Sequence, residues 1–130
     1  MGDMQLEASF EPESLKAFSK NEVTMEVSVE NTEDSNLYWG ECEISTKPPL
    51  SLAHDMQLDT GRMRIGILRP NSKIKKPVKL YTLPNNFPEE YPIKIIVYLY
   101  DVDGAIHKRL ELNKSISCIQ AGKEDAKAHV

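Results

Sequence analysis

Alternation of apolar and polar residues is the feature that most constrains the fold of this chain. In residues 23–30 every second residue is valine or methionine, and threonine, glutamate or serine stands between them. Residues 5–10 alternate in the same way. Successive side chains of a β-strand point to opposite faces, so a period of two predicts strands with one buried and one exposed side.

Turn-forming clusters separate the alternating segments. Pro, Asn, Asp and Ser are concentrated in residues 31–36, 70–72 and 83–90, where they favour tight turns. Residues 11–21 predict a loop with at most a short turn, and residues 46–61 predict a long irregular crossover. Seven or eight short strands without a convincing helix predict an all-β protein, a two-sheet antiparallel immunoglobulin-like sandwich.

Three details refine this prediction. Residues 93–100 are apolar on both faces, which predicts the central strand of a sheet. Tyr91 opens that strand after a Pro-Glu-Glu turn, where the tyrosine corner of such sandwiches stands. Pro77 predicts that its strand is weakly paired or near an edge, because proline has no amide hydrogen to donate.

The length and composition fit one domain. A chain of 130 residues that is 40% hydrophobic can bury a core without disulfides or metals, so we predict one sandwich over residues 1–120. Residues 121–130 have nothing to bury and predict a disordered tail. There is no run of 18 apolar residues and no secretion signal in residues 1–30, so we expect no membrane span and a cytoplasmic location.

Three short motifs resemble those of the CARDB-type immunoglobulin-like domains. Residues 27–31 resemble the family's strand that ends in asparagine, residues 68–72 its Leu-x-Pro-Gly-x-Ser turn, and residues 91–104 its closing hairpin. The overlap spans roughly residues 6–119. The resemblance implies a β-sandwich that serves as a binding or spacer module, and it names no ligand.

Residues 100–109, YDVDGAIHKR, place two aspartates and a glycine in the spacing of a calcium loop. An EF-hand with Gly104 at its sixth position would need ligands from Leu99 and Leu110, and leucine offers none. Asp-Gly between two apolar strands predicts a hairpin instead. The three histidines are scattered, and neither cysteine lies near one in the sequence, so we predict no metal and no cofactor.

The sequence carries no catalytic motif. It has no Gly-x-Ser-x-Gly, no Walker loop and no glycine-rich dinucleotide turn, and we predict that the chain is not an enzyme. Cys42 and Cys118 have inward parity, which predicts buried free thiols, with a disulfide between the sheets as the alternative, so their redox state stays open.

A β-bulge at Gly40 would turn four nearby residues inward. These are Leu37, Trp39, Cys42 and Ile44.

The central strand carries large apolar side chains on both faces, and the core between the two sheets can hold only one of these sets. The second face is therefore the leading candidate for a functional surface. An aromatic centre with a charged rim is typical of protein interfaces. In the alternative explanation, the crossover over residues 46–61 folds across this face with its four large apolar residues. The predicted partner-binding residues are Ile96, Tyr98, Tyr100, His107, Arg109 and Glu111.

The charge is unevenly spread along the chain. Residues 1–45 carry eleven acids against two lysines, and residues 62–79 carry seven bases and no acid. The basic segment either binds an anionic ligand, which could be RNA, an acidic lipid or an acidic protein, or its outward lysines neutralise Glu26 and Glu30 on a neighbouring strand. The candidate anion-binding residues are Arg62, Arg64, Arg69, Lys73, Lys75, Lys76, Lys79 and Tyr81.

We therefore expect a non-enzymatic protein-interaction module, an adaptor or accessory domain that binds another protein or self-associates as a homodimer through its aromatic face. The alternative function is the binding of an anionic ligand through residues 62–79. A net charge of −4 and the lack of interleaved aromatic residues disfavour nucleic acid.

Overall fold

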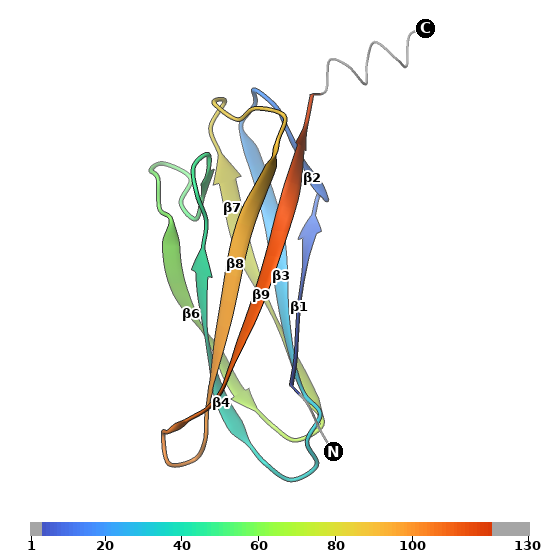
Figure 1. The fold of residues 1–130 in the computed structure, drawn as a ribbon, viewed down its shortest axis with the longest axis vertical. Coiled ribbons are helices and arrows are strands. Elements are labelled where there is room, and N and C mark those ends of the chain that lie inside the picture. The colour runs from blue at the N-terminus through green and yellow to red at the C-terminus, as the bar shows by residue number, and fades with distance from the viewer. Residues whose placement is uncertain (1–3, 121–130) are drawn as a thin grey trace, which may run out of the picture.

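The computed structural model describes residues 4–120, which form two β-sheets packed face to face (Figure 1). Within that range there is no helix, and hence none that could cross a membrane. The four-stranded sheet has the order β1-β3-β7-β5, and the five-stranded sheet has the order β2-β9-β8-β4-β6. The strands are β1 (Met4–Glu11), β2 (Ser14–Lys16), β3 (Asn21–Asn31), β4 (Tyr38–Ser45), β5 (Leu50–Ser51), β6 (Thr60–Leu68), β7 (Ser72–Thr82), β8 (Glu90–Tyr100) and β9 (Ile106–Ile119).

The described residues hold nine strands, so the predicted number of seven or eight was too low. The two missed strands are β2 and β5, of three and two residues. Residues 11–21 were predicted as a loop, yet Leu15 of β2 is fully buried and the strand pairs with β9. That pairing is parallel, so the sandwich is not purely antiparallel. Strands this short have no room to show a period of two.

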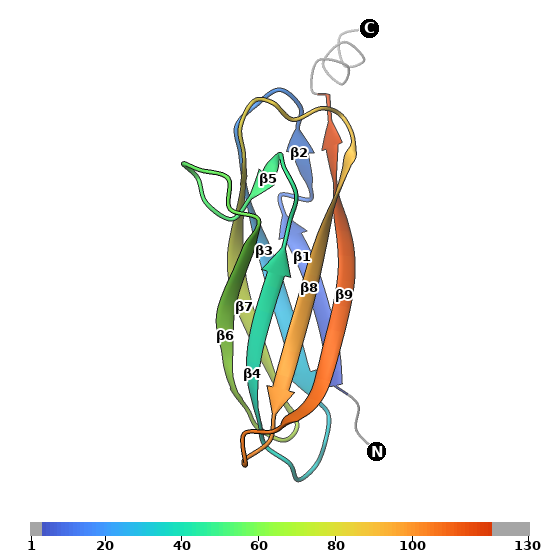
Figure 2. The same ribbon diagram turned by 60° about the vertical axis from the view of Figure 1, so that its left-hand side comes forward.

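Alternation correctly predicted the longer strands and their inner faces. Strands β3 and β7 pair as expected, with Val23 opposite Leu80 and Val29 opposite Ile74. Strand β8 is the central strand of the five-stranded sheet and lies between β9 and β4 (Figure 2). The core fills the space between the two sheets and includes both cysteines, whose side chains are buried and unpaired. Burial raises the pKa of the Cys42 thiol to about 12, which keeps it protonated and unreactive.

The tyrosine corner is present at the connection between β7 and β8. The Tyr91 hydroxyl donates to the carbonyl oxygen of Phe87 over 2.5 Å and accepts from the Phe87 amide over 2.8 Å. Tyr91 itself is buried. One side chain therefore fixes the backbone of the loop that leads into the central strand.

The predicted bulge exists, but its extra residue lies in β6. Gly40 pairs with Gly66 and Glu41 pairs with Arg64, so Ile65 has no partner of its own. Strand β4 keeps a strict alternation in which Tyr38, Gly40, Cys42 and Ile44 point inward. The prediction that Trp39 points inward was therefore wrong. Leu37 lies before the strand and is only half-buried.

The crossover over residues 46–61 does not cover the outer face of the five-stranded sheet. Its strand β5 pairs with Thr82 and Tyr81 of β7, in the other sheet, and Leu50 is fully buried there. The Ser51 hydroxyl accepts from the amides of Ala53 and Leu58, which folds the rest of the segment into a compact loop. The alternative in which this segment shields the aromatic face was wrong.

Residues 101–105 form the turn of the hairpin between β8 and β9, as the Asp-Gly pair predicts. Asp101 Oδ1 accepts from the amides of Asp103 and Ala105 over 2.9 and 3.1 Å. Gly104 has a φ of +82°, which favours glycine because it has no Cβ. The predicted tail over residues 121–130 lies outside the described residues.

Candidate interaction surface

The outer face of the five-stranded sheet is a grid of side chains that the strand register fixes. We call it the outer face, and it is made by β9, β8, β4 and β6. One row across these strands is Arg109, Tyr98, Glu41 and Arg64, and the next is Glu111, Ile96, Glu43 and Arg62. A third row, nearer the β8–β9 hairpin, is Ile106, Tyr100, Trp39 and Ile67.

The third row is apolar and was largely missed by the sequence analysis. Ile106 is 60% exposed and Ile67 is 48% exposed, while Trp39 and Tyr100 are half-buried between them. Since Trp39 was expected to point inward, its position beside Tyr100 could not be predicted. Strict alternation along β4, without a bulge in that strand, is the signal that would have found it.

Charged groups of opposite sign meet in the two polar rows. Arg62 Nε lies 3.4 Å from Glu43 Oε2, and Arg109 donates to Glu111 over 3.0 Å. The guanidinium of Arg62 lies over the Tyr98 ring at 5.7 Å, and that of Arg64 over Trp39 at 5.6 Å. In these two rows three arginines meet three glutamates around an aromatic centre, and exposed Lys94 in the adjoining row of β8 adds a fourth base.

Five of the six predicted partner-binding residues come together on this face. Tyr98 and Tyr100 are accessible at its centre, and Arg109 and Glu111 are exposed beside them on β9. Hydrogen bonds from Asn113 and Arg109 lower the pKa of Glu111. Ile96 is only 7% exposed, so it packs beneath its neighbours and contributes little accessible area to the outer face.

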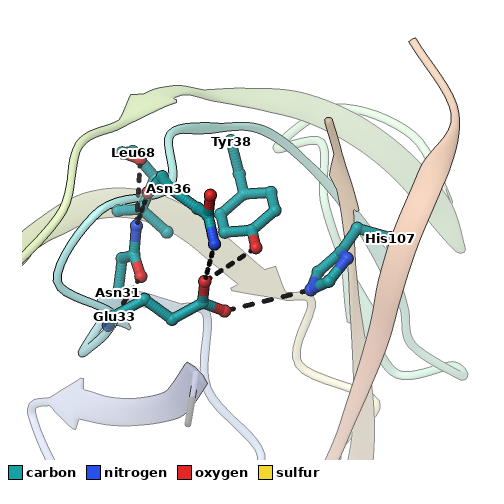
Figure 3. Close-up of polar contacts among 6 residues, drawn as sticks. All are labelled: Asn31, Glu33, Asn36, Tyr38, Leu68 and His107. Atoms are coloured by element: carbon teal, nitrogen blue, oxygen red, sulfur yellow. Dashed lines mark hydrogen bonds and ion pairs between the residues drawn. The ribbon is translucent and has the colours of Figure 1, made fainter. Parts of the chain in front are cut away.

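The sixth, His107, points elsewhere. It is the extra residue where the β8–β9 register shifts, since Leu99 pairs with Lys108 and Tyr100 with Ile106. Its ring stacks on Tyr38 with centroids 4.5 Å apart, and Nε2 lies 3.9 Å from Glu33 Oε2 (Figure 3). The predicted position of His107 beside Arg109 on the outer face was therefore wrong.

Glu33 is the centre of this second cluster (Figure 3) and lies in the connection between β3 and β4. Its Oε1 accepts from Asn36 Nδ2 and from the Tyr38 hydroxyl, each over 2.8 Å. These hydrogen bonds, the one from Asn36 first, lower the pKa of Glu33. Burial, and then the bond to Glu33, raise the pKa of Tyr38 to about 12. The cluster ties the β3–β4 connection to β9.

The structure divides the predicted basic segment between two sheets. Arg62 and Arg64 lie on the outer face of the five-stranded sheet, whereas Lys73, Lys75 and Lys79 lie on the outer face of the other sheet. Arg69 is in the turn between them. Tyr81 contacts His54 edge-to-face at 5.9 Å. Residues 62–79 therefore do not form one continuous basic patch, because the turn at residues 69–71 reverses the chain into the opposite sheet.

Neutralisation across strands accounts for part of the charge, as the second explanation predicts. Lys75 lies 3.8 Å from Glu26, and Lys79 lies 2.9 Å from Glu22. The expected partner Glu30 stands opposite Lys73 in the register. Within residues 4–120 no group of three or more metal-ligating side chains comes together.

Comparison with known proteins supports the fold alone. No protein-family model and no curated protein sequence matches this chain. A chain in the complex of zinc 2-glycoprotein with prolactin-inducible protein from human seminal plasma is similar in structure, with a TM-score of 0.60 and 14% identity, over 89% of this chain and 93% of that one.

Two further solved structures are similar over nearly their whole length. A non-cellulosomal cohesin from the archaeon Archaeoglobus fulgidus has a TM-score of 0.57 and 13% identity, covering 98% of this chain and 99% of that one. The bacterial hydrophobin BslA has a TM-score of 0.54 and 12% identity, covering 92% and 98%. At these identities the comparison establishes a β-sandwich.

Proposed function

We propose that this chain is a protein-interaction module that binds another protein, or a second copy of itself, through the outer face. The observation that carries the proposal is the juxtaposition of Trp39, Tyr98 and Tyr100 on a sheet surface that none of residues 4–120 covers. Trp, Tyr and Arg are the residues that most often dominate the binding energy of interfaces. Here arginines from β6 and β9 surround the rings.

The charge pattern favours a protein over a polyanion. The arginines of the outer face stand next to Glu41, Glu43 and Glu111, and a phosphate-binding surface would not place three carboxylates among its bases. Charges of both signs around an aromatic centre fix the orientation of a protein partner instead. The solved neighbour that comes from a two-protein complex is consistent with this class of function.

We also propose that the sandwich is immunoglobulin-like and related in topology to the CARDB-type domains. The strand orders β1-β3-β7 and β9-β8-β4-β6, together with the hydrogen bonds of Tyr91, support the topology. A module of this kind displays a sheet face without needing catalytic residues, in keeping with a non-enzymatic role.

Self-association is tested by sedimentation of the purified chain over a range of concentrations. Tyr98→Ser should weaken a dimer at least about 5-fold, since truncation of a central aromatic residue costs more than about 1 kcal/mol. Tyr81→Ser is the matched control, because Tyr81 is a half-buried tyrosine on the other sheet and should leave association unchanged.

A different partner is tested by a photo-crosslinking residue placed at position 98 or at position 81 in the native cell. We expect a discrete cross-linked product from position 98 and none from position 81. A chain that stays monomeric at millimolar concentration and gives equal or no cross-linking at both positions would contradict the proposed function.

A further inference from the structure

The basic segment forms the two strands that border an open edge of the sandwich. Within the described part of the chain, strand β6 ends the five-stranded sheet and pairs only with β4, while residues 72–80 of β7 pair only with β3. The two strands lie near each other across the space between the sheets (Figure 2). Each therefore has a row of backbone amides and carbonyls without a strand partner on its outer side.

An apolar groove lies along this open edge. It has a volume of about 170 Å³ and is lined by residues of β4, β6, β7 and the crossover loop. A cavity of about 150 Å³ holds a molecule the size of benzene, so the groove accommodates one large apolar side chain. Leu58 is 40% exposed within it. The lining residues are Ile44, Leu52, Leu58, Gly61, Arg62, Met63 and Val78.

Gly61 is the point at which Leu52 approaches β6 most closely. A Cβ at this position would lie 3.0 Å from Leu52 Cδ1, closer than ordinary carbon contacts. The regular part of β6 runs from Thr60 to Arg64 and ends at the bulge of Ile65, after which Gly66 has a φ of +109°. Five residues of undistorted edge strand therefore lie beside the groove.

The charges around the open edge are positive and partly unpaired. Among the described residues, Arg64, Lys73 and Lys76 take part in no ion pair. Lys76 has the parity of the inner face, opposite the fully buried Val27, yet it is only half-buried. A lysine in such a position extends its ammonium group toward solvent, here at the margin of the edge.

We propose that this open edge binds an extended acidic segment of a partner protein, which adds as a strand to Thr60–Arg64 of β6. Backbone hydrogen bonds supply affinity in strand addition, and alternate side chains supply specificity. One apolar side chain of the segment enters the groove beside Leu58 and Met63. The intervening acidic side chains all point to the outer face, where they meet Arg64, which has no ion pair within residues 4–120, and compete with Glu43 for Arg62.

The test uses four fluorescent ten-residue peptides and the intact chain. The first alternates valine with glutamate, the second valine with lysine, the third is the first with N-methylated alternate amides, and the fourth is a scrambled Val/Glu sequence. Only the first should bind saturably, with a dissociation constant below about 100 μM. Its binding should protect the amides of residues 60–64 from hydrogen exchange.

Each control separates strand addition from a simpler cause. Equal binding of the lysine peptide would show that charge does not determine binding. Equal binding of the N-methylated peptide would show that backbone hydrogen bonds do not. Charged edges and bulges also serve to prevent pairing, and an edge with that role alone binds none of the four peptides. Binding of a single-stranded oligonucleotide in competition with the first peptide would replace the protein partner by nucleic acid.

Variants locate the binding and keep it distinct from the outer face. Leu58→Glu places a negative charge in the groove and should weaken binding of the first peptide more than 10-fold. Met56→Glu is its control in the same loop, since Met56 is more exposed and does not line the groove. Arg109→Ala changes the outer face on the far side of β8 from Arg62 and should leave peptide binding unchanged. Equal losses from Leu58→Glu and Met56→Glu would overturn the proposal without affecting the proposed function.

Discussion

Glu33 is in contact with several polar and charged groups at once. Its carboxylate faces Asn36, Tyr38 and His107, and the charge of Lys108 also acts on it. These groups favour the charged form, so the pKa of Glu33 in the folded chain lies below its ordinary value. The stabilisation is present above the unfolded pKa and is lost as the pH falls through the folded pKa.

We expect the free energy of unfolding of the wild-type chain to fall more steeply between pH 6 and pH 3 than that of Glu33→Gln. Glutamine keeps an oxygen acceptor for Asn36 and Tyr38 but has no charge to lose. Urea unfolding at several pH values measures the difference, and the other carboxylates cancel in the comparison. Glu90→Gln should also flatten the curve, because Ser117 and Ser115 lower the pKa of Glu90. Parallel curves for wild type and Glu33→Gln would show that the cluster stabilises nothing through charge.

Residues next to bulges were the ones that the sequence could not place. A bulge sets two residues of one strand against one of its neighbour, so parity alone cannot tell which strand holds the extra residue. Trp39 was expected inward because the extra residue was placed in β4, when it is Ile65 of β6. His107 is likewise the extra residue of β9. Away from these points, the predicted positions of Tyr98, Tyr100, Arg109 and Glu111 agree with the structure.

At the scale of strands, β4 and β6 fit together because Gly40 leaves room for the bulge. A Cβ on Gly40 would lie 2.9 Å from Ile65 Cβ and 3.2 Å from its Cγ2. Ile65 is buried, so it cannot move away without disturbing the core. We expect Gly40→Ala to lower the free energy of unfolding by about 1–3 kcal/mol, the usual cost of overpacking.

Chemical denaturation of three variants checks this prediction. Ser45→Ala changes the outer side of the same strand and should fall within about 0.5 kcal/mol of wild type. Ile65→Gly removes the Cβ and the γ-carbons that crowd the new methyl group, so the double variant should lose less than the sum of the two single losses. A strictly additive double variant would place the cost of Gly40→Ala outside this contact.

Element length decided how much of the fold could be predicted. Strands β3, β7, β8 and β9 have eleven or more residues. Alternation predicted the inner faces of β3, β7 and β9, and apolar residues on both faces identified β8 as the central strand. Strand β2 contributes a single buried side chain, Leu15, and β5 has two residues whose position depends on β7. Such strands form because the neighbouring sheet strands offer backbone hydrogen-bond partners. Those partners are distant in the sequence, so the local residue pattern cannot predict them.

At the scale of the whole molecule, the fold distributes the acidic and basic segments of the chain over both sheets. The acids of β3 stand beside the lysines of β7, which neutralises one sheet locally. The arginines of β6 lie in the other sheet among the glutamates of β4. Neither arrangement is visible in a linear charge count, because the turn at residues 69–71 separates neighbours in sequence onto opposite sheets.

Arg62 is the residue at which the two proposed surfaces meet. Its guanidinium lies over Tyr98 and pairs with Glu43 on the outer face, and the same residue lines the groove at the open edge. Arg109 pairs with Glu111 and stands beside Tyr98, on the opposite side of β8 from Arg62. We therefore expect Arg62→Ala to weaken both outer-face association and binding of the Val/Glu peptide, by several-fold each.

Arg109→Ala is the matched control and should weaken outer-face association alone. Sedimentation and peptide anisotropy on the same preparations give both values, and thermal unfolding shows that each variant remains folded. If the surfaces share Arg62, a peptide bound at the edge moves its guanidinium and changes the affinity of the outer face for its partner. By linkage, the partner then changes the affinity for the peptide by the same factor. An Arg62→Ala variant that retains full binding at either surface would separate the two, and the coupling would then be absent.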